Sequence, residues 1–540
     1  MQQSAYITTP IYYVNDKPHI GHAYTTTLCD VWARAMRFCG RDTFFLTGTD
    51  EHGSKVEKSA QAKGISPQQL ADENSAEFRR VLALFGLSND DFIRTTEPRH
   101  ERQVQVLLRQ LVATGDVYLG EFEGWYDEGQ EEYHTETKAK ELEYKSPISG
   151  RPLVRAREHN YYFRLSAFQK RLEDFFATNP EFVRPNARVN EVLSRLRDGL
   201  QDVPITRTNF TWGIPMPDAP GHVVYVWIDA LFNYVTALDL AEPMSAAHSA
   251  RSQYWPARYH VIGKEILWFH AVIWPALLMA LKLPLPQCIY AHSFWIADGQ
   301  KMSKSLGNFI DLPTIERYHA AYSLDAWRWY MVTQGPLEAT DADFSAKHFH
   351  EMYTAELVNT FANCASRTSA MIGKYFDGKL PAEATGDALT NRVWSAIAAD
   401  VTSRTITHYE RFELRQAAQT ALSLIREVDG FINETQPFKL AKDPANTAQL
   451  ATILYRCAEA IRIASVLLWP VMPSKVEELW RCFGVVCDPR EGKLSAVCAW
   501  GQSRAGTPIE KCALYMRVDA PLAPLAPLAP VAPAAPAAPA

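Results

Sequence analysis

Residues 6–22 read YITTPIYYVNDKPHIGH, and residues 43–49 read TFFLTGT. The β-branched and aromatic residues 6–14 predict a buried strand that breaks at Asn15–Pro18. We expect a helix over His19–Gly40 and a second buried strand over residues 43–49. A strand, a helix and a strand in succession indicate a parallel βαβ unit. The predicted fold class is therefore α/β, with a doubly wound parallel sheet of the Rossmann type.

The rest of the chain divides into segments of different character. Residues 121–143 hold nine acidic and two basic residues among Tyr, Trp and Phe, and turn signals follow. This indicates an α+β connective domain inserted into the sheet domain, whose pattern returns at 222–235 and 259–282. Nearly continuous helical patterning up to Trp480 predicts an all-α domain. The predicted limits are 1–115 and 216–290 for the two halves of the sheet domain, 116–215 for the insertion, 291–345 for a linking region, 346–515 for the helical domain and 516–540 for a tail.

Composition places few limits on function. The net charge of −6 excludes a chain held to nucleic acid by global positive charge, but it leaves local basic grooves open. Nine cysteines form no CxxC pair, which indicates reduced thiols, and no leader or membrane-spanning run is apparent. We expect a cytoplasmic protein without membrane contact. Proline recurs at every third position from 521 to 539, and this predicts a polyproline tail without a packed core.

The sequence His19-Ile20-Gly21-His22 stands where the first predicted helix begins. A helix N-terminus carries free N–H groups and positive potential, which suit a triphosphate. Two histidines three residues apart face the same side and can donate to phosphate oxygens, while Gly21 lets a ring approach the backbone. Taken alone, the four letters could equally be two surface histidines at a helix start.

A second motif, Lys301-Met302-Ser303-Lys304-Ser305, follows the turn Asp298–Gln300. Two ammonium groups on a loop preceded by glycine can close over a phosphoryl group and stabilise the charge of departing pyrophosphate. A solvated basic loop is the alternative for any KxxK sequence. HIGH after the first strand and KMSKS near residue 300, in this order, resemble the signature of class I aminoacyl-tRNA synthetases.

The wider pattern is more specific. TTPIYYVND, GTDEHG (48–53), NFTWGIPMP (209–217), VYVWIDALFNYV (224–235) and VIGKEILWFH (261–270) surround the two signatures. Over roughly residues 5–480 the chain resembles methionyl-tRNA synthetases. The resemblance implies ATP-dependent activation of L-methionine, with Mg²⁺ on the phosphates, and transfer to the acceptor end of tRNA(Met). Such chemistry demands positioning and charge stabilisation, so we expect no Ser/His/Asp triad and no catalytic cysteine.

The same resemblance implies the site residues. Asp50 matches the carboxylate that receives the substrate ammonium. Aromatic walls suit a polarisable thioether, and the positions that match the methionine pocket are Ile11, Tyr13, Trp227, Ala230, Leu231, Tyr234, Ile266, His270 and Trp274. Four of them (Trp227, Tyr234, Ile266 and Trp274) could instead be ordinary core residues. The implied ATP-binding residues are His19, Gly21, His22, Gly263, Glu265, Lys301, Met302, Ser303 and Lys304, and those implied to be catalytic are His19, His22, Lys301 and Lys304.

In the helical domain, Asn363 and Arg367 resemble the family's anticodon-reading NxxxR. At positions i and i+4 they share one helix face and can reach unstacked bases together. The family's second anticodon element is an aromatic residue after proline, and here Phe438 stands where Trp is expected. Phenylalanine still stacks on a base, with less area. A solvated helix face is the alternative for Asn363 and Arg367.

The sequence departs from the family pattern in two ways, and each leads to a further expectation. Many members carry zinc knuckles built on CxxC pairs, but this chain has no cysteine between Cys39 and Cys288. Asp127 and Glu128 stand where a ligand pair would follow Trp125 and Tyr126, so we expect no zinc and an insertion held by its own packing. Only the Pro/Ala tail follows the helical domain, so we expect a monomer.

Three rival interpretations are open to test. A synthetase for cysteine would want thiolate ligands, and one for leucine, isoleucine or valine would carry a far larger editing insertion than about 100 residues. A non-catalytic tRNA-binding relative would not need His19, His22, Lys301 and Lys304. A nucleotidylyltransferase would not need a helical RNA-binding domain. Pyrophosphate exchange with each amino acid separates all of these.

Overall fold

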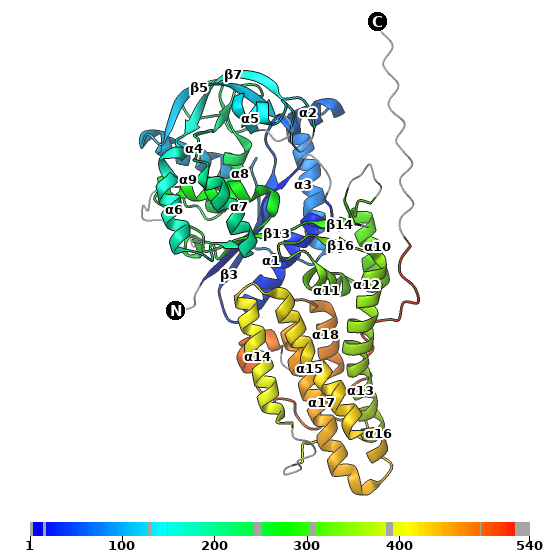
Figure 1. Cartoon of the computed structure of the whole chain (residues 1–540). Helices are drawn as coiled ribbons and strands as arrows, with labels where there is room; N and C mark the ends of the chain where they lie inside the picture. The colour runs from blue at the N-terminus through cyan, green and yellow to red at the C-terminus, as the bar shows by residue number, and fades with distance from the viewer. Residues whose placement is uncertain are drawn as a thin grey trace, which may run out of the picture.

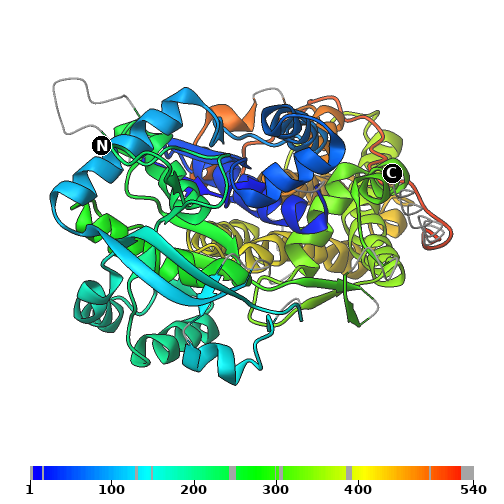
Figure 2. The ribbon, with the colours of Figure 1, turned by 90° about the horizontal axis from the view of Figure 1, so that it is seen from above.

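The computed structural model describes residues 4–14, 18–127, 132–134, 136–147, 150–241, 251–297, 299–302, 308–384, 392–485 and 488–523. A lobe built on β-sheets lies at one end, and a long bundle of helices extends from it (Figure 1). Seen from above, the inserted strands (cyan) lie along one side of the molecule and the yellow and orange helices lie beneath the sheet (Figure 2). None of the described helices is both long and apolar enough to cross a lipid bilayer.

The sheet lobe is organised around a seven-stranded parallel sheet. Its order is β2-β3-β1-β12-β13-β8, with β4 paired to β3. Every residue of β1, β3, β12 and β13 is buried, as expected for parallel strands covered on both faces. The α/β class predicted from the sequence is thus confirmed. The strands are β1 (Ala5–Thr8), β2 (Tyr12–Tyr13), β3 (Thr43–Asp50), β4 (Asp91–Arg94), β8 (Val183–Arg184), β12 (Tyr259–Gly263) and β13 (Ile289–His292).

The helices of this lobe begin close to where the sequence predicts, with local differences. The predicted strand over 6–14 is two short strands, because Pro10 cannot donate to a ladder. The mostly helical stretch 54–115 also contains β4, and the helix-like stretch 264–282 includes a π-helical turn over Phe269–Ile273. The helices are α1 (Ile20–Phe38), α2 (Ser54–Lys63), α3 (Pro67–Leu84), α4 (Pro98–Ala113), α8 (Val226–Thr236) and α9 (Trp274–Ala280).

The inserted segment forms a separate antiparallel sheet of order β6-β5-β7-β9. Its long strands β5 and β7 pair continuously from Val117–Phe163 to Tyr126–Val154. Two helices lie between its strands β7 and β9 in sequence, and a two-stranded ribbon then leads back toward α8. The elements are β5 (Val117–Asp127), β6 (Glu132–His134), α5 (Glu136–Glu141), β7 (Val154–Phe163), α6 (Gln169–Thr178), α7 (Asn186–Arg197), β9 (Val203–Pro204), β10 (Thr206–Arg207) and β11 (Val223–Val224).

A small sheet and two helices connect the lobe to the bundle. In this sheet β14 pairs with β15 antiparallel and with β16 parallel. On α11, Arg328 is fully buried; it donates to Asp30 of α1 (2.7 Å) and to the carbonyl of Val471 in the bundle (2.9 Å). Because a buried charge requires such partners, this guanidinium ties lobe and bundle together. The elements are β14 (Trp295–Ala297), β15 (Gln300–Lys301), α10 (Leu312–Tyr322), α11 (Leu324–Gln334) and β16 (Ala342–Phe344).

The outer helices of the bundle are amphipathic, and the centre of the bundle is apolar. On α15 the buried residues recur three and four apart, whereas α17 is buried almost all round and forms the central helix. Residues 353–362 form a π-helical stretch between α12 and α13. The helices are α12 (Ala346–Met352), α13 (Asn363–Tyr375), α14 (Trp394–Glu410), α15 (Leu414–Thr435), α16 (Pro437–Leu440), α17 (Thr447–Leu468), α18 (Pro473–Cys482) and α19 (Leu494–Val497).

Candidate active site

The first helix begins with two histidines that cap it. His19 is the N-cap: its Nδ1 accepts from the Gly21 N–H (3.1 Å), and Nδ1 of His22 accepts from the His19 N–H (3.2 Å). A nitrogen that accepts carries no proton, so each ring holds its hydrogen on Nε2. A side chain at residue 21 would place Cβ 2.9 Å from Cε1 of His19, so glycine is needed for the ring to lie there.

Both rings can therefore present an N–H donor at the positive end of α1. The ring centroids lie 3.9 Å apart. Burial, with a smaller effect of His19, lowers the pKa of His22 well below its usual value. His22 is therefore neutral at physiological pH, yet it still holds one N–H. This arrangement suits hydrogen bonding to phosphate oxygens at a helix N-terminus.

The segment that follows the KMSKS motif meets this helix end. The Ile20 N–H donates to the Ile310 carbonyl (3.1 Å), and the ring of Phe309 lies 5.2 Å from that of His19. The backbone of Lys301 pairs with Ile296 in the β14–β15 hairpin, and Met302 is half-buried. Ser303 and Lys304 lie outside the described residues. Segments 290 residues apart in sequence thus converge at one end of α1.

The carboxyl ends of adjacent parallel strands gather the other candidate residues. Asp50 ends β3 and is the register partner of Tyr13 in β2. At the end of β12, a Cβ on Gly263 would lie 2.3 Å from Oε2 of Glu265, so the exposed carboxylate of Glu265 lies directly against the backbone of Gly263. Ligands of doubly wound sheets bind at this edge, outside the carboxyl ends of the strands.

Helix α8 and the π-helical turn form an aromatic wall beside that edge. Trp227 stacks on Phe269 with centroids 4.0 Å apart and planes 10° apart. Nδ1 of His270 lies 3.0 Å from the Ile266 carbonyl, which can only accept, so Nε2 accepts from the Tyr234 hydroxyl at 2.7 Å. Burial lowers the pKa of His270 to about 4, so the ring is neutral and does not repel a cation.

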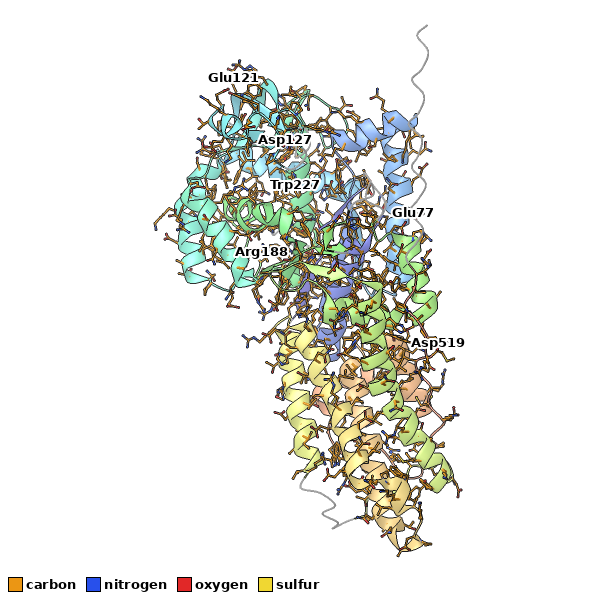
Figure 3. All side chains as sticks on the ribbon, turned by 45° about the vertical axis from the view of Figure 1, so that its right-hand side comes forward. Glu77, Glu121, Asp127, Arg188, Trp227 and Asp519 are labelled. Carbon is orange, nitrogen blue, oxygen red and sulfur yellow. The ribbon has the colours of Figure 1, made fainter. Side chains whose placement is uncertain are left out.

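The predicted pocket residues differ in burial. Ile11, Tyr13, Trp227 and Ile266 are half-buried, whereas Asp50, Ala230, Leu231, Tyr234, His270 and Trp274 are buried. Apart from Ala230 and His270, the apolar and aromatic members belong to or pack against one hydrophobic cluster of the lobe. Trp227 is labelled in Figure 3, in the lobe and well above the helical bundle. Trp274 is fully buried and lies behind Tyr234, with centroids 5.8 Å apart.

Sequence reasoning missed several polar residues behind this wall. His260 of β12 stacks on Tyr234 (4.1 Å) and bonds Thr8 and Trp274. His52, which lies two residues after Asp50, forms a buried hydrogen-bonded group with His100 and Asp229. His52 and Asp229 stand within the quoted motifs GTDEHG and VYVWIDALFNYV, but nothing in their spacing shows that they meet across 177 residues.

The candidate anticodon residues lie in the bundle, away from the sheet. Asn363, the first residue of α13, is exposed, and Arg367 one turn later lies 3.7 Å from Asp429 of α15. Phe438 of α16 is 45% exposed, so part of its ring is accessible to solvent. Both α13 and α16 lie on the same side of the bundle, in its lower half (Figure 1).

A family model, related proteins and solved structures all show similarity to the same group of enzymes. The family described as "tRNA synthetases class I (M)" matches residues 5–142 and 138–369. A methionine–tRNA ligase of Halalkalibacterium halodurans is 41% identical over 96% of this chain and 79% of its own length. One of Streptomyces coelicolor is 41% identical over 94% and 95%, respectively. The structure of Mycobacterium tuberculosis methionyl-tRNA synthetase in complex with methionyl-adenylate superposes with a TM-score of 0.86, at 34% identity, covering 94% of this chain and 98% of that one.

Proposed function

The chain belongs to the methionyl-tRNA synthetases, and we propose that the carboxyl edge of its parallel sheet is the site where methionine meets ATP. The enzyme is a methionine–tRNA ligase: it activates L-methionine with ATP and charges tRNA(Met). ATP serves as its magnesium complex, as in other class I synthetases. The finer assignments of residues to roles are our proposals.

The main support for this site is that groups complementary in charge to ATP and methionine converge at one edge of the parallel sheet. The capped end of α1 offers N–H donors for the phosphates, and Glu265 beside Gly263 offers acceptors for ribose hydroxyls. Asp50 offers a carboxylate for the substrate ammonium, next to an aromatic wall for the thioether. With the ammonium on Asp50, the methionine carboxylate is directed toward the α-phosphorus for in-line attack. Lys301 and Lys304 then stabilise the departing pyrophosphate.

Aminoacylation tests this function directly. Incubation of the purified protein with ATP, Mg²⁺, labelled methionine and unfractionated tRNA should give acid-precipitable label on tRNA(Met) alone. Labelled leucine, isoleucine, valine and cysteine serve as matched controls and should give background. Exchange of pyrophosphate without any transfer to tRNA would instead indicate a nucleotidyl-transferring relative that has lost its tRNA substrate.

We further propose that the bundle reads the anticodon. Asn363 and Arg367 share one face of α13, and Phe438 exposes its ring. A guanidinium and an amide can bond the edges of unstacked bases, and an exposed aromatic ring can stack on one. On this proposal the divisions at about residues 115, 215, 290, 345 and 515 separate catalytic, connective, stem-contact and anticodon-binding parts. A monomeric state and a cytoplasmic location stay predictions.

We propose that the inserted domain is held without zinc. Three of its side chains form a clasp: Glu136 accepts from Trp125 Nε1 (2.7 Å) and from the Tyr144 hydroxyl (2.9 Å), and the two aromatic rings lie 4.6 Å apart. Among the residues that the structure describes, no group of three or more His, Cys, Asp or Glu side chains is placed to hold a metal. Asp127, where the sequence departs from a knuckle, is buried.

Metal analysis checks this proposal. After dialysis against a chelator, elemental analysis of the purified protein should find far less than one equivalent of zinc, and activity should be unchanged. The physical reason is that a structural zinc site needs four soft or borderline ligands, mostly thiolates. One equivalent of zinc that survives dialysis would show that other ligands hold a metal in the insertion.

A further inference from the structure

We propose that Asp229 is a positioning residue for methionine activation. Bonded to His52 and His100, it fixes the turn formed by residues 50–53 (the 50–53 turn) to helix α8, and so fixes Asp50 relative to the methionine pocket. The inference rests on the proposed function, since it takes Asp50 as the group that receives the substrate ammonium. It adds residues that would touch neither methionine nor ATP.

Both oxygens of the Asp229 carboxylate are engaged. Oδ2 accepts from Nδ1 of His52 (2.7 Å), and Oδ1 accepts from Nε2 of His100 (2.6 Å). Nδ1 of His100 lies 2.7 Å from the hydroxyl of Thr236, at the far end of α8. The three side chains are at most 3% exposed. Charge-assisted hydrogen bonds in a site from which water is excluded are strong and directional.

The electrostatics agree with this geometry. Burial alone would lower the pKa of His52, but the Asp229 carboxylate raises it above its usual value. Burial alone would also raise the pKa of Asp229, but His52 and His100 hold it below its usual value. The carboxylate is therefore ionised at neutral pH and attracts both imidazoles. A buried charge destabilises the folded state unless every one of its partners remains in place.

The network joins three elements that form different parts of the site. Asp229 lies on α8, between the candidate pocket residues Trp227 and Ala230. His52 lies two residues after Asp50 in the 50–53 turn, and His100 lies on α4. A shift of the Asp229 bonds would therefore move the ammonium-binding carboxylate relative to the wall that holds the thioether. Displacements of about 1 Å are enough to impair a positioned reaction.

Other contacts also hold the same turn. Arg94 donates twice to the buried Glu51 carboxylate (2.7 and 2.8 Å). Trp212 donates from Nε1 to the Glu51 carbonyl (2.6 Å) and accepts from the Gly53 N–H (3.0 Å). These bonds hold the turn to β4 and to the loop that carries Trp212. The bond between His52 and Asp229 extends this support to the pocket helix.

A methionine analogue without the amine separates positioning from general support. 4-(Methylthio)butanoate keeps the thioether, the chain length and the carboxylate of methionine, so its binding does not use Asp50. In Asp229→Asn, one histidine loses its acceptor, and we expect KM for methionine in pyrophosphate exchange to rise about 10-fold or more. The inhibition constant of the analogue and KM for ATP should stay within about threefold. If methionine and the analogue weaken equally, the network only maintains the pocket and the proposal is wrong.

Variants of His52 give a second test that does not remove the buried carboxylate. Asparagine places its amide near the position of imidazole Nδ1 and can still donate to Asp229, whereas alanine cannot. We expect His52→Ala to reproduce the selective loss for methionine and His52→Asn to restore most of it. No difference between these two variants would overturn the proposal. Asp325→Asn, at a buried carboxylate of α11 that accepts from the Lys475 N–H, is the matched control and should change neither constant.

Asp50→Asn distinguishes failure of this inference from failure of the proposed function. If Asp50→Asn weakens methionine selectively and Asp229→Asn does not, the site assignment stands and the positioning role is excluded. If Asp50→Asn weakens methionine and the analogue alike, Asp50 does not receive the ammonium, and the inference falls with that assignment. If both variants are selective, Asp50→Asn combined with Asp229→Asn should lose less than the product of the single effects.

Discussion

Replacing Lys304 by alanine is expected to lower kcat of pyrophosphate exchange by about 10²-fold or more, with KM for methionine nearly unchanged. In the proposed site the ammonium group acts on charge that develops as pyrophosphate departs, and this charge is absent from bound methionine. An interaction made mainly in the transition state affects kcat and kcat/KM together. Lys301→Ala should behave in the same way, since in the proposed site both cations act on the phosphates.

Steady-state exchange at saturating ATP, with methionine varied, measures both constants for each variant. Lys347→Ala is a suitable control, because this lysine on α12 is 79% exposed and pairs only loosely with Glu351 at 3.8 Å. It should match the wild type. A rise in KM for methionine with normal kcat in Lys304→Ala would mean that the loop contributes to amino-acid binding instead of to the departure of pyrophosphate.

Replacing Arg367 by alanine is expected to reduce kcat/KM for tRNA by between ten- and more than a hundredfold and to leave methionine activation unchanged. Loss of one base contact costs about 1–3 kcal/mol. Arg367 is 34% exposed beside Asp429 in the bundle, whereas the proposed activation site lies in the sheet lobe. Phe438→Ala should follow the same pattern, because stacking on one base is worth about 1–3 kcal/mol. Phe438→Trp should be neutral or slightly improved.

Parallel exchange and aminoacylation assays on each variant provide the measurement. Arg404→Ala removes an arginine from α14 of the same bundle, 58% exposed and paired with Asp400, and should leave both assays unchanged. Equal loss in both assays for Arg367→Ala would mean that the residue supports the fold. Normal charging by Arg367→Ala would place anticodon recognition elsewhere on the bundle.

The local features of the fold could be predicted from sequence because they depend on neighbouring residues. The helix that begins after His19 and the buried strand over 43–49 both follow from residue type and periodicity. The short strand β4 was missed, because four residues between two helices give too short a pattern. The π-helical turn that carries His270 also has no signature in residue spacing.

Only those residues of the candidate site that lie in recognisable motifs could be predicted from the sequence. Resemblance marked Asp50 and Trp227 individually, but it did not show how their neighbours interact. Asp229 and His100 lie 129 residues apart, and their bond depends on how α4 packs against α8. Single histidines and aspartates carry no periodic signal, so tertiary contacts of this kind become visible only in the folded structure. The role of Ser303 and Lys304 rests on the motif alone, since they lie outside the described residues.

The central claim is that the sheet edge and its aromatic wall select methionine for activation. The most direct test is ATP–pyrophosphate exchange with each of the standard amino acids supplied singly and without tRNA. We predict rapid exchange with methionine alone, because a branched side chain such as that of leucine or isoleucine misfits the pocket at a cost of about 1–3 kcal/mol. Exchange with leucine, isoleucine, valine or cysteine at a rate comparable to methionine would contradict the claim.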